Sequence, residues 1–180
     1  RIDTDSRALA VELSGVWAPS GSITAASLTL TDNSVIDAET FLLSGDAEMS
    51  LSTSSSIEGA TLSLTGVSLG VDATSEVSAS GRGETAGNGL SPGCHYPSNY
   101  VAGCGGNHGG VGSVGYSAAV SGSHYGSSVY PIEPGSGGGS GFHGTGGRGG
   151  GTVRIALTST FTHEGAVRDD GAAGGGSSSQ

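Results

Sequence analysis

The chain has 180 residues, of which 36 are glycine, and its 16 acidic and six basic residues give a net charge of −10 at pH 7. All six basic residues are arginines, so no basic stripe is present that could hold phosphate, which excludes nucleic-acid binding and attraction to anionic membranes. No apolar run is long enough to cross a bilayer, so we expect no membrane insertion. Because the sequence starts at Arg1 rather than at Met, we expect it to be part of a longer protein.

An apolar triplet recurs about every twenty residues in the first part of the chain. Within a triplet the second member follows the first by two residues and the third follows the second by six, and successive triplets start 19, 21 and 20 residues apart. A fixed period of this length indicates one structural unit stacked on copies of itself. The four triplets are Leu9, Val11 and Trp17; Leu28, Leu30 and Ile36; Met49, Leu51 and Ile57; and Leu69, Val71 and Val77.

Within each unit, apolar residues alternate with Ser, Thr and Asp, as in the segment 27–31. A period of two is typical of a strand with one buried face. Second apolar clusters at Ile23, at 41–43 and at 62–64 indicate two or three short strands per unit. Twenty residues at roughly 3.3 Å each give a perimeter of about 65 Å, which suits one coil of a β-solenoid.

We therefore predict an all-β fold, a parallel β-helix or β-solenoid with coils of about 20 residues over residues 1–81. The alternative is a β-sandwich or jelly roll, whose strands also recur every eight to twelve residues. A sandwich has no reason to keep one apolar spacing four times, because its strands face different neighbours.

Residues 82–150 are rich in glycine and are predicted to leave the stack as a long excursion. Glycine of this density favours either a disordered linker or a tightly packed stack of loops, and the interspersed Tyr and His favour order. All five tyrosines fall here and are candidate contacts for a ligand or partner, either as stacking platforms for sugars or as covers of the glycine backbone. They are Tyr96, Tyr100, Tyr116, Tyr125 and Tyr130.

The two cysteines, Cys94 and Cys104, enclose nine residues. The simplest interpretation is a disulfide that closes a loop, which implies an oxidising, extracellular compartment. The rival is a zinc site with His95 and His108, but the spacing matches no usual zinc pattern, so we predict no metal site. The scattered acidic residues form no calcium loop, and calcium binding stays an alternative to a merely solvated acidic surface.

Residues 151–180 return to the strand pattern and then end in a Gly/Ser-rich tail. Phe161 and Val167 stand six apart, as Leu51 and Ile57 do, and this predicts a further coil, although Ser159 occupies its first apolar position. The predicted core of the repeat comprises Leu28, Leu30, Ile36, Met49, Leu51, Ile57, Leu69, Val71, Val77, Phe161 and Val167.

The sequence contains no recognisable catalytic set. The one compact candidate is 168–171 with His143 as a companion, but paired aspartates beside a glycine are typical of a turn. The run 144–150 precedes a strand and lacks the lysine of a phosphate-binding loop. We predict no enzyme and no cofactor; a polysaccharide lyase or hydrolase built on a β-helix is a minor alternative.

The segments 134–141, 146–155 and 161–171, together with the Gly-Gly-x-His-Gly-Gly element at 105–110, resemble the Gly-rich modules of very large secreted and cell-surface proteins of bacteria and protists. The resemblance covers roughly residues 60 to 175 and departs from the family pattern at His163, Arg168 and Asp169. It implies a parallel β-helix-like module of a stalk, adhesin or filament, and it supplies no catalytic residues.

The expected function is therefore a structural module of an extracellular surface protein or filament, whose partners are copies of itself or neighbouring modules. The alternative is a carbohydrate-binding or adhesive module that uses the tyrosines. No Asn-x-Ser/Thr sequence occurs, which excludes N-linked glycan, whereas O-linked glycan on the many Ser and Thr residues stays open.

Overall fold

A computed structural model describes residues 10–13, 15–18, 21–94, 103–109, 112, 123–127, 129–130, 132–141 and 144–176. The chain divides into two compact units: unit 1 comprises residues 1–78 and 153–168, and unit 2 comprises residues 79–152 and 169–180. The boundaries expected at 81 and 151 lie within three residues of those at 78 and 153. The tail from 169 differs from expectation, because it groups with the glycine-rich unit rather than with the returning coil.

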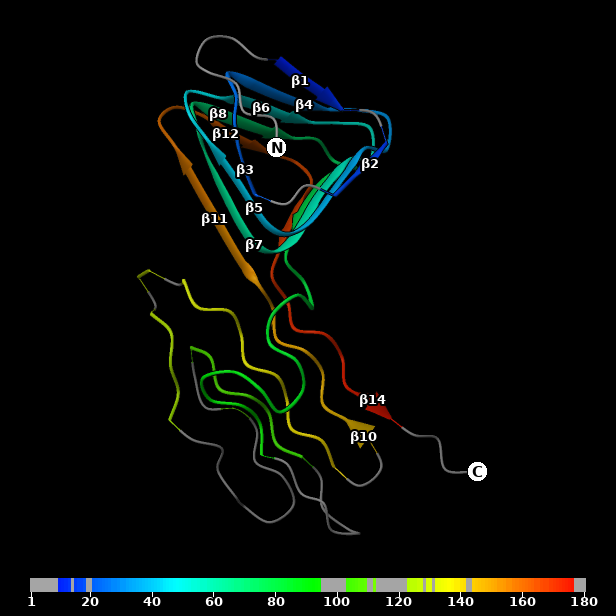
Figure 1. The fold of residues 1–180 in the computed structure, drawn as a ribbon, viewed down its shortest axis with the longest axis vertical. Coiled ribbons are helices and arrows are strands. Elements are labelled where there is room, and N and C mark those ends of the chain that lie inside the picture. The colour runs from blue at the N-terminus through cyan, green and yellow to red at the C-terminus, as the bar shows by residue number, and fades with distance from the viewer. Residues whose placement is uncertain are drawn as a thin grey trace. The chain divides into compact units, whose positions relative to one another are not determined.

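Unit 1 consists of strands stacked in ladders (Figure 1). The first sheet has the order β1 (Ala10–Leu13), β4 (Ser27–Leu30), β6 (Glu48–Leu51), β8 (Ser68–Val71) and β12 (Phe161–His163), and all its pairs are parallel. The second has the parallel order β13 (Ala166–Arg168), β9 (Glu76–Ser78), β7 (Ser56–Gly66), β5 (Val35–Ser44) and β2 (Val16–Trp17). In addition, β3 (Gly21–Thr24) pairs with β5, and β11 (Thr152–Leu157) pairs with β7.

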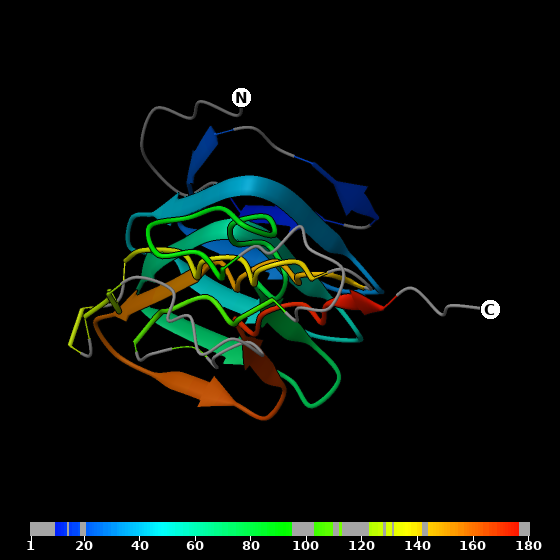
Figure 2. The same cartoon turned by 90° about the horizontal axis from the view of Figure 1, so that it is seen from below.

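The strand register follows the apolar triplets. Leu28 pairs with Met49 and Met49 with Leu69, while Ile36 pairs with Ile57 and Ile57 with Val77. The prediction of an all-β fold built from parallel strands is confirmed. Figure 2 shows these strands in chain order, from blue through cyan and green to orange. The triplet residues from Leu28 to Val77 are all buried and form one core with Ile23, Phe41, Leu43, Leu62 and Leu64.

The long strands β5 and β7 turn a corner without breaking. In β5 the inward residues Ile36 and Ala38 are followed by two exposed residues, and Phe41 and Leu43 then point inward again. The inward side chains thus change from even-numbered to odd-numbered residues, and at this point the strand passes from one side of the core to the next (Figure 1). In β7 the corner falls at Ala60 and Thr61. A Cβ on Gly59, directly before this corner, would lie 2.3 Å from the carbonyl oxygen of Ala38. Glycine is therefore required at that position.

The two end repeats depart from the expected register. In β1, Val11 pairs with Leu28 and Leu13 with Leu30, two residues later than the first triplet predicts; Leu9 lies outside the described residues. In β12, Phe161 pairs with Leu69 rather than standing at the position of Val71. The reason lies in the turns: Leu13 and Trp17 are four positions apart, as are His163 and Val167, whereas the equivalent residues of the middle repeats are six positions apart.

The last repeat also differs from expectation in its burial. Phe161 and Val167 were expected in the core, but their side chains are 46% and 37% exposed. In the part of the chain that the structure describes, β12 and β13 are end strands, so a neighbouring strand covers each of them on one edge only.

Unit 2 contains two short strands, β10 (Gly144–Thr145) and β14 (Gly175–Gly176), which pair antiparallel. The rest of its described part consists of extended segments, such as 135–140 and 146–150, and of turns and bends in 80–91. Segments 135–141 and 144–150 run antiparallel, because the amides of Gly135, Gly138 and Gly141 donate to the carbonyls of Gly150, Gly147 and Gly144 over 2.8, 2.9 and 3.0 Å. One hydrogen bond at every third residue matches the polyproline II helix, which has three residues per turn and no internal hydrogen bonds.

Close packing of these segments requires glycine with the same period. A Cβ on Gly144, Gly147 or Gly150 would lie 2.7, 1.8 or 1.6 Å from a carbonyl oxygen of segment 169–175. On a second face of the same segment, a Cβ on Gly146 or Gly149 would lie 1.9 Å from an oxygen of segment 135–138. Unit 2 is thus packed backbone against backbone, as the chains of collagen are, where only glycine fits between neighbours.

Candidate functional site

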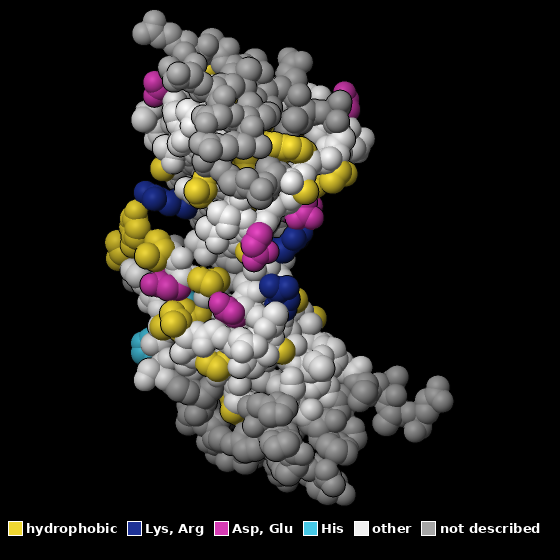
Figure 3. Space-filling view, in the orientation of Figure 1, with side chains coloured by type: hydrophobic (Ala, Val, Ile, Leu, Met, Phe, Trp, Pro, Cys, Tyr) yellow, Lys and Arg dark blue, Asp and Glu magenta, His cyan; other side chains and the backbone are white. Residues whose placement is uncertain are grey.

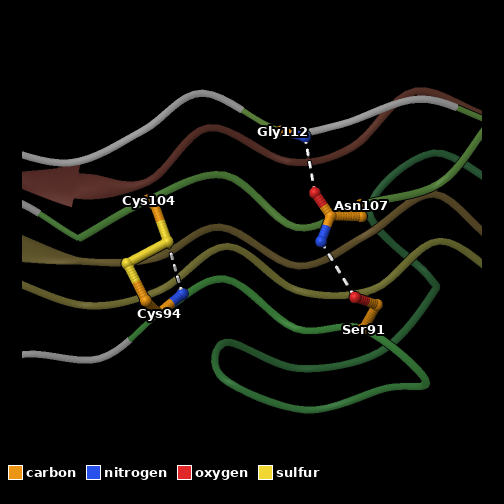
Figure 4. The surroundings of a disulfide bond; sticks show 5 residues. All are labelled: Ser91, Cys94, Cys104, Asn107 and Gly112. Atoms are coloured by element: carbon orange, nitrogen blue, oxygen red, sulfur yellow. Dashed lines mark hydrogen bonds between the residues drawn. A yellow bond between two sulfur atoms is a disulfide. The ribbon is translucent and has the colours of Figure 1, made fainter. Parts of the chain in front are cut away.

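A chain of polar side chains crosses the glycine-rich segments of unit 2. The buried Asn107 accepts a hydrogen bond from the amide of Gly112 over 2.6 Å and donates to the hydroxyl of Ser91 over 2.9 Å (Figure 4). The Ser91 amide in turn donates to the hydroxyl of Ser136 over 3.1 Å. Asn107 belongs to the Gly-Gly-x-His-Gly-Gly element, so one role of this element is to join three segments.

The same chain continues to Tyr125. The Ser136 hydroxyl donates to the phenol oxygen of Tyr125 over 2.9 Å, and this phenol donates to the carbonyl of Pro134 over 2.6 Å. The ring of His108 meets the Tyr125 ring edge to face at 5.0 Å. Tyr125 therefore covers and ties the glycine segments, one of the two uses expected of the tyrosines.

Tyr130 has a different environment. Its side chain is 56% exposed, and the neighbouring Val129 and Ile132 are exposed as well. Its backbone amide donates to the hydroxyl of Ser127 over 2.9 Å, which shapes the loop that presents it. Tyr130 is thus an aromatic residue that is partly open to solvent. The other candidates, Tyr96, Tyr100 and Tyr116, lie outside the described residues.

A polar cavity of about 250 Å³ opens within unit 2. It is lined by Gly135, 149–151 and Gly171, together with His108, Ser136, Arg148 and Asp169. The Arg148 guanidinium is held in place because its Nε and Nη2 donate to the carbonyl of Gly83 over 3.2 and 2.9 Å. Imidazole, hydroxyl, guanidinium and carboxylate side chains are groups that can hydrogen-bond a polar ligand such as a sugar.

The predicted disulfide between Cys94 and Cys104 is confirmed (Figure 4). The Cys104 amide donates to the Cys94 carbonyl over 3.3 Å, and the Gly139 amide donates to the Cys104 carbonyl over 2.8 Å. The bond therefore fastens two segments that also pair through their backbones. With both sulfurs joined, neither is a thiolate ligand for zinc; His95, the nearest partner in the rival zinc site, lies outside the described residues.

A second polar region lies at the turns of unit 1. Ser34, Ser55 and Ser75 occupy equivalent positions in three successive turns and are all buried. The Ser34 and Ser55 hydroxyls donate to the carbonyls of Thr31 and Ser52 in their own turns. Neighbouring turns are also linked, since the Ser55 amide donates to the Ser75 hydroxyl over 3.2 Å. These contacts form a serine ladder along the turns.

Asp72 organises the last of these turns. Hydrogen bonds from the Ser75 hydroxyl and from the Thr53 amide, then those from Thr74, lower the pKa of the Asp72 carboxyl from 3.8 to about 2. The Thr53 amide belongs to the preceding turn and donates over 2.8 Å, so the carboxylate bridges two repeats. A groove of about 360 Å³ beside it is lined by Ser54–Ser56, Ala73–Glu76, Gly165, Ala166 and Arg168. The carboxylate thus has a structural role that accounts for its hydrogen bonds.

The described residues among the catalytic candidates are divided between the two units. Arg168 lies 3.8 Å from Glu76 in unit 1, whereas Asp169 and Asp170 are exposed residues of unit 2. The Asp170 carbonyl accepts the Gly81 amide over 2.8 Å. Residues 169–171 form no turn, so the turn predicted for this Asp pair is wrong. His143 lies outside the described residues, and His163 stacks on Phe161 at 5.4 Å.

Among the residues that the structure describes, no group of three His, Cys, Asp or Glu side chains could hold a metal ion. Acidic side chains are spread over the face drawn in Figure 3 rather than gathered in one patch. In the described ranges, no helix has the length and apolarity needed to span a bilayer.

The sequence prediction missed the Ser91, Asn107 and Ser136 network, although one signal for it was present. Glycines recur at every third position at 103, 106, 109 and 112 and again from 135 to 150. Polar residues set between such glycines are the side chains that can join neighbouring segments. Comparison with known proteins adds nothing to this site, because no family model, curated protein or solved structure matches the chain.

Proposed function

We propose that the chain is a non-catalytic structural module of an extracellular surface protein or filament, in which unit 1 is a β-solenoid. The observation that carries the proposal is the stacking of successive repeats in parallel register, Leu28 on Met49 on Leu69 and Ile36 on Ile57 on Val77, around a core of side chains. Stacks of this kind are extended in one dimension and suit stalks and fibres.

The Cys94–Cys104 disulfide supports the extracellular part of the proposal. Disulfides form and persist in oxidising compartments and are rare in the cytosol. The shortage of lysine and arginine and the net charge of −10 keep such a module away from nucleic acid and anionic lipid.

Labelling of intact cells tests the proposal. An antibody against the chain is applied to source cells before and after permeabilisation, while a thiol reagent reports on Cys94 and Cys104 in the native material. We expect surface label without permeabilisation and no thiol reaction before reduction. Label that appears only after permeabilisation, with free thiols, would contradict an extracellular role.

A glycan-binding or adhesive module is the second candidate, supported by the 56% exposure of Tyr130 and by the polar cavity with Arg148 and Asp169. Aromatic faces stack on sugar rings, and a carboxylate accepts hydrogen bonds from sugar hydroxyls. A glycan array with the full chain tests it, with Tyr130→Ala and Asp169→Asn as variants. Specific binding that either substitution weakens at least tenfold would favour this function; an array without signal would remove it.

A further inference from the structure

We propose that copies of this chain associate head to tail, with strands β1 and β2 of one copy continuing the ladders that end at β12 and β13 of another. This inference rests on the proposed function as a structural module and names its partner, a second copy. Three features of unit 1 carry it: the sheet ends, the length of the end turns and the apolar side chains at both ends.

The first sheet and the path β13–β9–β7–β5–β2 of the second sheet end in the same two repeats. In the described part of unit 1, β1 and β12 are the terminal strands of the first sheet and β2 and β13 are those of this path, while β3 and β11 branch off it at β5 and β7. Each terminal strand is paired along one edge by its sheet neighbour. The other edge carries amide and carbonyl groups in the spacing of a parallel ladder, which is a template for a further strand.

The two end repeats match each other better than either matches the middle of the stack. Leu13 and Trp17 are four residues apart, as are His163 and Val167, whereas six residues separate Leu30 from Ile36. Each end turn has a glycine at the same place, Gly15 and Gly165.

Every paired position of the last repeat therefore stands 150 residues after its counterpart in the first: Phe161 after Val11, His163 after Leu13, and Val167 after Trp17. When β1 and β2 of a second copy follow β12 and β13, both ladders continue in register through turns of equal length. Within one chain, by contrast, the short turn that contains Gly165 stacks on the longer turn between Val71 and Val77. Glycine is needed at position 165 because a Cβ there would lie 2.2 Å from the Ser75 carbonyl oxygen.

Apolar side chains are exposed at both ends. Val16 in β2 is 80% exposed, and Phe161 and Val167 at the opposite ends of the sheets are partly exposed. Trp17 packs against the core but is only partly buried. A second copy in this register places Trp17 beside Val167 and so covers apolar surface that is open to water in the single chain.

The contact joins two different surfaces, so it does not close on itself. A heterologous contact of this kind generates open chains of subunits, whereas a two-fold contact between identical surfaces stops at a dimer. This difference makes the proposal testable with two variants that each block one end.

The variants are Val16→Asp, which places a charge at the β2 end, and Val167→Asp, which places one at the β13 end; Val129→Asp, an exposed valine of unit 2, is the matched control. Sedimentation velocity is measured on the oxidised full chain at concentrations up to about 1 mM, which detects association with free energies near −4 kcal/mol. Thermal unfolding must match the wild type within a few degrees, so that misfolding is not read as a blocked end.

We expect the wild type and Val129→Asp to form species that grow with concentration, and each end variant alone to stay monomeric. An equimolar mixture of the two end variants keeps one intact junction and yields 1:1 dimers only. A monomeric wild type, association that survives both end substitutions, or a mixture of folded variants without dimers overturns the proposal. Filaments that still form when their subunits carry either substitution would be consistent with the proposed structural function and would rule out only this contact.

Discussion

At the scale of single residues, the glycines of unit 2 are fixed by contact rather than by flexibility. A Cβ on Gly150 would lie 1.6 Å from the carbonyl oxygen of Asp169, and that oxygen belongs to backbone that cannot rotate away. By contrast, nothing lies within 4 Å of a Cβ on Gly176, at the end of β14 in the same unit. Glycines that look alike in the sequence therefore differ in how strictly the structure requires them.

This contrast gives a first prediction. Gly150→Ala should lower the free energy of unfolding by about 3 kcal/mol, the cost of forcing extra volume into packed structure, whereas Gly176→Ala should change it by less than about 0.5 kcal/mol. Urea denaturation followed by circular dichroism measures both. Equal stability of the two variants would show that the segments are not packed backbone to backbone.

Asp72 gives a second prediction, on pH. Its pKa is lowered from 3.8 to about 2 in the folded chain, so the folded state favours the carboxylate. The stabilisation from Asp72 is therefore complete above pH 3.8 and is lost as the pH falls toward 2. We expect Asp72→Ala to destabilise the chain at pH 7 and to differ much less from the wild type at pH 2, in denaturation curves recorded at both values.

The control for Asp72 is Asp46→Ala, which removes an exposed carboxylate from the bend between β5 and β6. It should leave stability nearly unchanged at both pH values. A stability gap between the wild type and Asp72→Ala that stays constant from pH 7 to pH 2 would contradict the assigned role of the carboxylate.

At the scale of elements, the inner and outer faces of β5 give a third prediction. Phe41 is completely buried and pairs with Leu62, whereas the adjacent Leu42 points outward and is 39% exposed. Phe41→Ala should cost about 3 to 5 kcal/mol, and Leu42→Ala less than about 1 kcal/mol. Chemical denaturation of both variants measures the difference; similar losses would mean that the strand register is wrong.

The middle strands could be predicted from the sequence because their signal is local and repeated. Alternation within the strands and a constant step of about twenty residues between Leu28, Met49 and Leu69 fix both the strand type and the partner. The register of the end repeats could not be predicted, because their turns are two residues shorter than those of the middle repeats. A prediction that assumed constant apolar spacing therefore placed Val11 and Phe161 two positions away from their observed partners.

The structure of unit 2 could not be predicted from the sequence for a different reason. Its order comes from hydrogen bonds between backbones, such as that from Gly138 to Gly147, and these depend on which segments meet rather than on side-chain periodicity. The spacing of three between glycines was the available signal, but it does not specify neighbours. The buried Asn107 could be placed only once the segments were paired.

At the scale of the whole molecule, a net charge of −10 opposes the contact proposed between copies. Like-charged chains repel over about 30 Å at 10 mM salt but over only about 8 Å at 150 mM salt. We therefore expect head-to-tail association to strengthen as salt is raised across this range, since apolar side chains and backbone hydrogen bonds form the junction. Sedimentation velocity at several salt concentrations measures this trend; association that weakens with salt would instead indicate ion pairs between copies.

The most direct test of the structural role is electron microscopy of native material that contains this chain, first in calcium and then in chelator. The proposed function predicts regular filaments or surface fibres with a repeating subunit. Their loss in chelator would add that the acidic residues bridge cations. Discrete, unassembled particles under both conditions would contradict a structural module and turn attention to glycan binding at Tyr130 and the polar cavity.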